Sequence, residues 1–234
     1  MNRRWLRENP SSSATLLQAV VQVGQSFLHD PADSLHQIVP TVDPSLAQLG
    51  EPDARYGIIS RFAPGTKENG SFFGHSSRWR IWAECFTGRG DKAYEVLRKM
   101  SPITRHEADP DLYRIEPYVA CQFIYAPESG HPGEGSHSWA TGTAAWTLSL
   151  VWEWILGVRP EVDGLRIDPC LPSHWTHARM TRPYRGAIYE FEFAKPAGIC
   201  KGPIKILLDS LALEGNLLRP QGDGKTHRVQ VTIG

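Results

Sequence analysis

The chain has 234 residues, of which 41% are hydrophobic and 21% charged, a composition typical of globular proteins and not of disordered ones. Lys plus Arg and Asp plus Glu both number 25, and this zero formal net charge argues against binding nucleic acid or an anionic membrane through bulk charge. No apolar span is long enough to cross a membrane. The four cysteines are far apart in sequence, which excludes a C-x-x-C zinc or redox motif and favours free thiols in a reducing compartment. We therefore expect a cytoplasmic protein without a metal site.

The N-terminal part of the chain is predicted to be poor in regular structure. Apolar residues recur at helical spacing over residues 14–28, which predicts one helix. Residues 30–52 are rich in Pro, Asp, Ser and Gln without a sustained period, and we interpret them as a loop or linker. Residues 56–62 fit a short strand or an extended segment. By composition alone, the turn formers and polar residues of 63–70 are typical of a surface turn.

The middle of the chain is predicted to be helical. Residues 75–86 and 92–100 carry apolar residues three or four apart, with glycines between them, which predicts two helices joined by a tight turn. Asp91 is the expected cap of the second helix. Residues 113–125 are predicted to begin another helix, and 127–135 form a loop rich in Gly and Pro.

Residues 136–156 organise the rest of the chain. Their second half is apolar on almost every face, which predicts a helix inside a large core. Their first half contains Thr141, Gly142 and Thr143 at the start of that helix, where unpaired backbone N–H groups carry a partial positive charge. Such a start suits phosphate, sulfate or carboxylate. An ordinary threonine cap on a buried helix explains the same pattern.

After Gly157 the pattern changes from helical to β. Short segments that alternate or are β-branched are separated by turn residues; they cover residues 165–168, 178–181, 186–193, 204–208 and 228–233. Strands that follow a run of helices predict a mainly α protein with a β appendage.

Four motifs in register resemble glycoside hydrolase family 94, which contains cellobiose, cellodextrin, chitobiose and cellobionic acid phosphorylases. They are Lys67-Glu-Asn-Gly70, Glu116-Pro-Tyr118, Trp139-Ala-Thr-Gly-Thr-Ala144 and the segment 157–172. The resemblance covers roughly residues 53–195 in order and spacing. Residues 55–67 look most like the cellobionic acid type.

The resemblance implies a fold with three parts. Residues 1–52 would form an N-terminal helix and an irregular arm. Residues 53–160 would be the C-terminal part of an (α/α)6 barrel, a six-hairpin toroid, and residues 161–234 a small C-terminal β-region. The implied activity is that of a hexosyltransferase. It is an inverting phosphorolysis of a β-linked disaccharide, of the cellobiose or cellobionic acid type, to an α-sugar 1-phosphate. Inorganic phosphate is the co-substrate and no cofactor is implied; full-length family members can be homodimers.

The resemblance also implies site residues. The positions that match the family's phosphate ligands are His75, Gln122, Thr141 and Gly142, and those that match its sugar-binding Lys-Glu pair are Lys67 and Glu68. His75 also fits a helix cap, and Gln122 a buried amide bound to backbone.

Trp139 and Glu116 each begin one of these motifs, and neither matches a phosphate ligand or the sugar-binding pair. Trp139 fits the lining of the pocket, and Glu116 fits a structural hydrogen-bond anchor better than an acid. The chemistry agrees with the proposed ligands, because phosphate is already an anion and needs a cradle in line with the anomeric carbon instead of a base.

One motif of the family is missing. Its general acid is an aspartate in a Trp-Asn-Asp type motif upstream of Lys-Glu-Asn, and residues 1–66 contain no such motif. The chain therefore resembles the C-terminal third of a phosphorylase without its catalytic aspartate, and we expect exposed apolar helix faces. Two alternatives stay open: an inactive fragment that binds carbohydrate or phosphate, and an inverting hydrolase in which Glu68 or Glu116 acts on water.

Overall fold

The structure, a computed structural model, describes Ile58 and residues 61–234. The predicted helix over 14–28, the arm up to residue 52 and most of the extended segment 56–62 lie outside the described residues. The chain divides into two compact units, which within the described residues are 58–83 with 95–147 and 84–94 with 148–234. We call them the helical unit and the β unit. The division at residue 160 that the sequence suggests stays a prediction.

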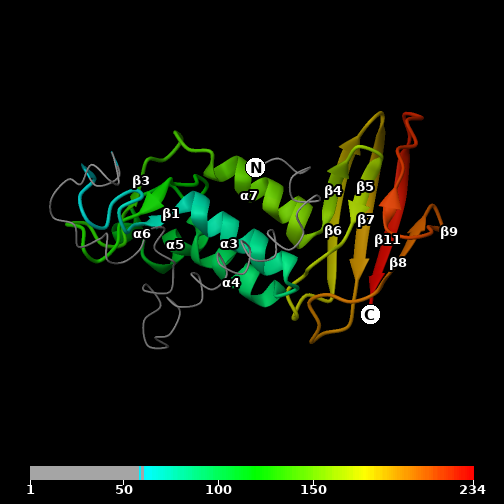
Figure 1. The fold of residues 1–234 in the computed structure, drawn as a ribbon, viewed down its shortest axis with the longest axis horizontal. Coiled ribbons are helices and arrows are strands. Elements are labelled where there is room, and N and C mark those ends of the chain that lie inside the picture. The colour runs from blue at the N-terminus through cyan, green and yellow to red at the C-terminus, as the bar shows by residue number, and fades with distance from the viewer. Residues whose placement is uncertain (1–57, 59–60) are drawn as a thin grey trace. The chain divides into compact units, whose positions relative to one another are not determined.

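Most helices belong at least in part to the helical unit (Figure 1). In chain order the elements up to residue 150 are β1 (Phe72–Phe73), α3 (Gly74–Phe86), α4 (Gly90–Lys99), α5 (Pro102–Ala108), α6 (Pro110–Tyr113), β2 (Phe123–Ile124), β3 (Gly135–Ser136) and α7 (Thr143–Leu150). The two predicted helices are confirmed as α3 and α4. Asp91 lies inside α4, and its carboxylate accepts the Ser173 N–H at 2.6 Å, so its predicted role as the cap is wrong.

The predicted helix over residues 113–125 is wrong. Tyr113 is the last residue of α6, and Arg114 follows in the left-handed region with φ 57°. Glu116 precedes Pro117, a position that disfavours α geometry, and proline offers no N–H to a helix. The chain instead turns at Pro117 and Tyr118, where the Val119 N–H donates to the Glu116 carbonyl at 3.1 Å, before it enters β2.

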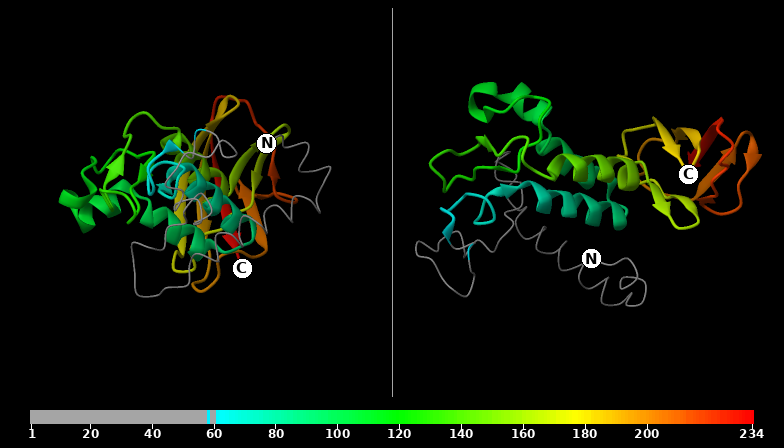
Figure 2. Two further views of the ribbon diagram at one scale, coloured as in Figure 1. Left: turned by 60° about the vertical axis from the view of Figure 1, so that its left-hand side comes forward. Right: turned by 90° about the horizontal axis from the view of Figure 1, so that it is seen from above.

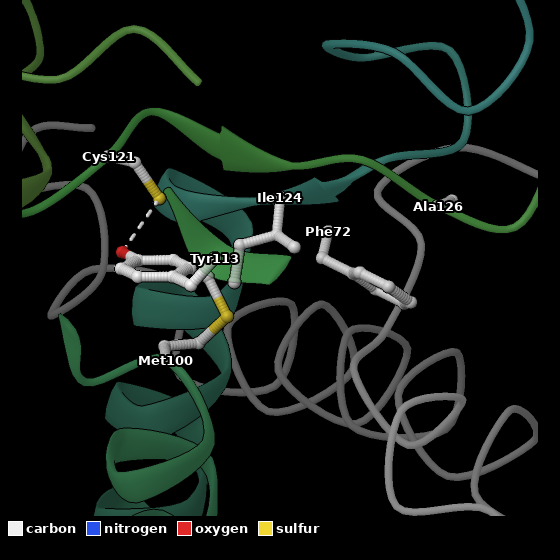
Figure 3. Close-up of a cluster of buried hydrophobic side chains, with 6 residues drawn as sticks. All are labelled: Phe72, Met100, Tyr113, Cys121, Ile124 and Ala126. Atoms are coloured by element: carbon white, nitrogen blue, oxygen red, sulfur yellow. Dashed lines mark hydrogen bonds between the residues drawn. The ribbon is translucent and has the colours of Figure 1, made fainter. Parts of the chain in front are cut away.

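Strands β1, β2 and β3 form a small antiparallel sheet that rests on a buried cluster. The cluster consists of Phe72, Met100, Tyr113, Cys121, Ile124 and Ala126, drawn in Figure 3. The Tyr113 hydroxyl points at the Cys121 thiol, 3.5 Å away, and Met100 packs beside the Tyr113 ring. Because β1 runs directly into α3, this cluster fixes where α3 begins.

Helix α7 continues into a π-helical turn, η2 (Val151–Ile155). Leu150 and Ile155 are buried, whereas 46% of Trp146 and 53% of Leu148 is exposed. The predicted burial in a large core is therefore wrong for the first turns of α7. Trp79 of α3 is also exposed and meets Trp146, with ring centroids 6.2 Å apart. The expected exposed apolar helix face is present at these residues.

The β unit contains one small sheet and one larger mixed sheet (Figures 1 and 2). Its strands are β4 (Val158–Glu161), β5 (Gly164–Ile167), β6 (His177–Tyr184), β7 (Ala187–Ala194), β8 (Ile204–Leu208), β9 (Leu211–Ala212), β10 (Leu217–Leu218) and β11 (Thr226–Ile233). The small sheet has the order β10-β5-β4 and the larger β6-β7-β11-β8-β9, with β7 and β11 parallel. Alternate residues of β7 and β11 are buried, as a sheet with one covered face requires.

The five strands predicted after Gly157 are confirmed, and β4, β9 and β10 are additional. Strands hold about as many of the described residues as helices do, so the prediction of a mainly α protein is wrong for this part of the chain, although helices do precede the sheets. Among the described residues, no helix combines the length and the apolar character needed to span a membrane.

Candidate functional site

The first residues of two helices meet in the helical unit. The Gly74 N–H, at the start of α3, donates to the Gln122 carbonyl at 2.6 Å. A Cβ placed on Gly74 would lie 2.5 Å from Oγ1 of Thr143, the first residue of α7. Only glycine lets the two ends approach so closely. Because each helix N-terminus carries a partial positive charge, their approach concentrates positive potential in one place.

The start of α7 is open to solvent on one side. Gly142 is exposed and Thr141 half-buried, whereas Thr143 is buried. The Thr141 hydroxyl accepts the Thr143 N–H at 3.1 Å and donates to Thr143 Oγ1 at 2.8 Å. The threonine-cap interpretation thus describes what Thr141 does within the chain. The exposed Gly142 backbone stays accessible to an anion.

His75 lies directly beside this helix start. Its Nε2 atom is buried and has no hydrogen-bond partner among the described residues. It would lie 3.5 Å from a Cβ placed on Gly142, so the ring faces that residue. The imidazole packs between Phe73 and Trp146, with ring centroids 5.2 Å and 6.3 Å away. A buried ring nitrogen without a partner costs free energy unless a ligand engages it.

The charge state of His75 suits an anion. Burial lowers the pKa of the imidazole below its ordinary value of 6.5, the positive charge of Arg78 lowers it further, and Glu68 acts in the opposite direction. His75 is therefore neutral at pH 7 and offers one N–H donor without a full positive charge.

Arg78, one helical turn after Gly74, lies beside these residues and is not predicted by the motifs. It is 2% exposed, and burial lowers the pKa of its guanidinium to about 10. Its Nε donates to Thr147 Oγ1 at 2.9 Å and its Nη1 to the Gly74 carbonyl at 3.4 Å. The available signal was its spacing, because Ile81 follows three residues later on the same buried face.

Two of the three other predicted phosphate and sugar residues, Gln122 and Glu68, lie close to Gly74 or His75. Gln122 is half-buried, and its backbone joins Gly74 to Ser136, so the carbonyl is engaged while its side chain carries no hydrogen bond within the described residues. Glu68 is close enough to affect the pKa of His75. The Lys67 ammonium lies 4.9 Å above the Phe62 ring and does not join the His75 group.

The turn that carries Lys67 and Glu68 is folded into the unit and is not merely a surface turn. Asn69 is 1% exposed, and its side-chain amide donates to the Phe62 carbonyl at 2.6 Å. Ser71 is also fully buried and donates to the Lys67 carbonyl. Lys67 itself lies in the left-handed region, with φ 45°.

Trp139 and Glu116 form a separate exposed pair. The Trp139 indole N–H donates to Glu116 Oε1 at 3.4 Å, and the Tyr118 ring lies 6.5 Å from that of Trp139. Trp139 is 72% exposed, so it does not line an enclosed pocket within the described residues. Glu116 holds an aromatic side chain, in agreement with its interpretation as a structural anchor.

Comparison with known proteins gives one family and several relatives. The model of the "Glycosyl hydrolase 94 superfamily, catalytic domain" matches residues 39–157, about half of the chain. The N,N'-diacetylchitobiose phosphorylase of Vibrio proteolyticus is 35% identical over 184 residues, which cover 78% of this chain and 23% of the relative. The solabiose phosphorylase of Paenibacillus borealis is 34% identical over 184 residues, covering 78% and 24%. The cellobionic acid phosphorylase of Neurospora crassa is 28% identical over 147 residues, covering 59% and 18%. The chain thus spans no more than about a quarter of the length of these relatives.

Proposed function

Because this chain belongs to the glycosyl hydrolase 94 superfamily, we propose that it forms the phosphate-binding part of an inverting glycoside phosphorylase. In this proposal, inorganic phosphate cleaves a β-linked disaccharide and an α-sugar 1-phosphate is released. The relatives above are named as disaccharide phosphorylases, which supports a phosphorylase-type reaction. Their different sugars do not favour the cellobiose or cellobionic acid type over another, and the disaccharide is therefore the open part of the proposal.

One observation carries the proposal: the buried, unpartnered Nε2 of His75 faces Gly142 at the start of α7. A helix start alone is a common feature and would not define a site. Here a second donor, Nε2 of His75, is desolvated, lacks an acceptor within the described residues and faces the same helix start. A phosphate oxygen supplies that acceptor, because it accepts strongly and carries the charge that helix N-termini favour.

The proposed cradle uses few full charges. His75 donates Nε2–H, the exposed backbone at Gly142 supplies its N–H, and the Gln122 amide is a further donor from the adjacent segment. Neutral donors hold the phosphate in line with the anomeric carbon and leave the nucleophile most of its negative charge. Thr141 contributes mainly by fixing the helix start, since its hydroxyl is engaged by Thr143.

The remaining features of the proposal concern the whole enzyme. Lys67 and Glu68 would contact the sugar, and the hairpin of α3 and α4 would be one of the hairpins of an (α/α)6 barrel that this chain forms in part. A homodimer and a cytoplasmic location belong to the proposal as well. The free thiols of the four cysteines are compatible with a reducing compartment.

A second candidate is a catalytically inactive protein that binds carbohydrate or phosphate. The observation that favours it is the lack of a Trp-Asn-Asp motif in residues 1–66. A positioned general acid contributes on the order of a hundred- to ten-thousand-fold in rate, so a chain without one would keep binding and lose most turnover.

Turnover assays separate these candidates. The protein is incubated with cellobiose, cellobionic acid or N,N'-diacetylchitobiose, with and without inorganic phosphate. Phosphate-dependent release of a sugar 1-phosphate is the result expected of a phosphorylase. Binding of phosphate without turnover supports the inactive binder, and sugar release that needs no phosphate would point to the hydrolase.

The His75→Ala variant tests the site itself. We expect inorganic phosphate to bind at least about tenfold more weakly by calorimetry, because one strong donor to the anion is lost. His131→Ala is the matched control, since His131 is exposed in the same unit and pairs with Glu134. Equal phosphate affinity in the two variants would mean that the anion site is assigned wrongly.

A further inference from the structure

We infer that Arg78 is a positioning residue of the proposed phosphate site, where its buried guanidinium holds the two helix starts together and adds one positive charge behind the neutral donors. The inference rests on the proposed function, and nothing in the family resemblance assigns a role to this residue. It is carried by three observations: the burial of Arg78, its hydrogen bonds and its lack of a carboxylate partner in the described part of the chain.

The surroundings of Arg78 are unusual for a buried arginine. Its guanidinium bonds to a hydroxyl and a carbonyl, both neutral acceptors, and no Asp or Glu of the described residues forms an ion pair with it. Two partly shielded arginines of the β unit do have such partners: Arg159 lies 2.8 Å from Asp168, and Arg182 lies 4.0 Å from Glu153. Arg105 of the helical unit bonds to a carbonyl as well, but it is half-buried, whereas Arg78 is only 2% exposed. A buried cation without a counter-ion is costly, so its persistence indicates that the counter-charge comes from a ligand.

The hydrogen bonds of Arg78 connect both helix starts. Nη1 reaches the carbonyl of Gly74, the first residue of α3. Nε reaches Thr147, whose hydroxyl donates to the carbonyl of Thr143, the first residue of α7. One side chain therefore fixes the spacing across which His75 faces Gly142. The positive charge of Arg78 also acts on His75, because it helps to lower the pKa of that imidazole.

The test compares three variants. Arg78→Met removes the charge and the hydrogen bonds, and Arg78→Lys keeps the charge on a smaller head group. Arg105→Met is the matched control: Arg105 is half-buried in the same unit, and its Nε donates to the Lys99 carbonyl. Phosphate affinity is measured by calorimetry, the pKa of His75 by NMR titration, and folding by circular dichroism.

We expect Arg78→Met to weaken phosphate binding at least about tenfold and to raise the pKa of His75, and Arg78→Lys to keep most of the affinity. Arg105→Met should change neither. If a folded Arg78→Met binds phosphate like Arg105→Met, or if Arg78→Lys loses as much affinity as Arg78→Met, the role of the charge is refuted. If His75→Ala alone loses phosphate affinity, the proposed function is kept and the role of Arg78 is rejected. If neither His75→Ala nor Arg78→Met loses phosphate affinity, the proposed function and the role of Arg78 are both rejected.

If the Arg78 variants do not fold, the wild-type protein still decides the question. The Nε–H signal of Arg78 is followed by NMR while inorganic phosphate is added. We expect it to shift with the same midpoint as the calorimetric binding curve, while the signal of Arg105 stays in place. An Arg78 signal that does not respond to saturating phosphate overturns the inference.

Discussion

Each unit of this chain contains a shielded histidine, and their surroundings are opposite. In the helical unit, Nε2 of His75 has no partner among the described residues, and burial and Arg78 lower the pKa of the ring. In the β unit, His227 has a carboxylate on each ring nitrogen, with Asp209 Oδ2 2.7 Å from Nδ1 and Asp223 Oδ1 2.9 Å from Nε2. These two carboxylates raise the pKa of His227.

The difference separates the proposed phosphate-binding histidine from a structural one. His227 stacks on Tyr189 at 5.6 Å, and Asp209 also accepts the Arg228 N–H, so both ring nitrogens of His227 are used to join loop to strand. Neither ring nitrogen is left for a ligand. His75 is instead held in place by packing and keeps a donor unused, as expected of a residue whose partner arrives from solution.

The largest effect is expected from Gly74→Ala, which tests whether the proposed phosphate site depends on the approach of α3 to α7. The added methyl would lie 2.5 Å from Thr143 Oγ1 and 2.7 Å from the Gln122 carbonyl, so the helix starts must separate. We expect a loss of about 1–3 kcal/mol in the free energy of unfolding, as is common for overpacking, together with loss of measurable phosphate binding.

Gly130→Ala is the control for this change, because a Cβ at Gly130 meets nothing within 4 Å. Urea unfolding and calorimetry on the two variants give the comparison. If Gly74→Ala keeps wild-type stability and phosphate affinity, the close approach of the two helix starts has no functional consequence.

A smaller effect is expected at Thr141. Thr141→Ala removes the hydroxyl that accepts the Thr143 N–H, and loss of such a cap costs about 1 kcal/mol. We expect phosphate to bind severalfold more weakly, because the first turn of α7 frays while His75 is unchanged. Thr141→Ser keeps the hydroxyl and should restore both affinity and stability, and a serine variant as weak as the alanine variant would contradict this role.

The sequence could predict the elements whose formation depends on neighbouring residues in the chain. The hydrophobic period of residues 75–86 and the alternation over 186–193 depend on neighbours in the sequence, and both elements form where expected. The helix predicted over 113–125 did not form, because Pro117 and the long-range pairing of β2 with β1 and β3 outweigh local helix propensity.

The candidate site was predictable only in part. His75, Gln122, Thr141 and Gly142 were found through motifs in register, and the structure places His75 beside Gly142. Arg78 was not found, since an arginine within a helix is most often solvent-exposed and its burial depends on Thr147, 69 residues later in the chain. Long-range contacts of this kind leave no local pattern.

The smallest effect is the pH dependence of the β unit, because its charges lie near the surface and are screened by salt. The folded-state pKa of His227 is raised above its ordinary value of 6.5, so its stabilising contribution is fully present below pH 6.5 and is lost as the pH rises through the folded-state pKa. The pKa values of Asp209 and Asp223 are lowered from 3.8, chiefly by their hydrogen bonds to His227, so their contribution is lost as the pH falls below that value.

His227→Gln should lower the melting temperature most between about pH 4 and 6.5 and least at pH 9, while His177→Gln, at an exposed position of β6, should show no such trend. His75→Gln should show the reverse dependence, because the lowered pKa of His75 makes its protonation in acid destabilising to the folded state. Phosphate should change the His75 dependence and leave that of His227 in place. If the melting temperatures of His75→Gln and His227→Gln depend on pH in the same way, the proposed difference between the two histidines is contradicted. That difference is between a histidine that binds an anion from solution and one that is paired with carboxylates of its own chain.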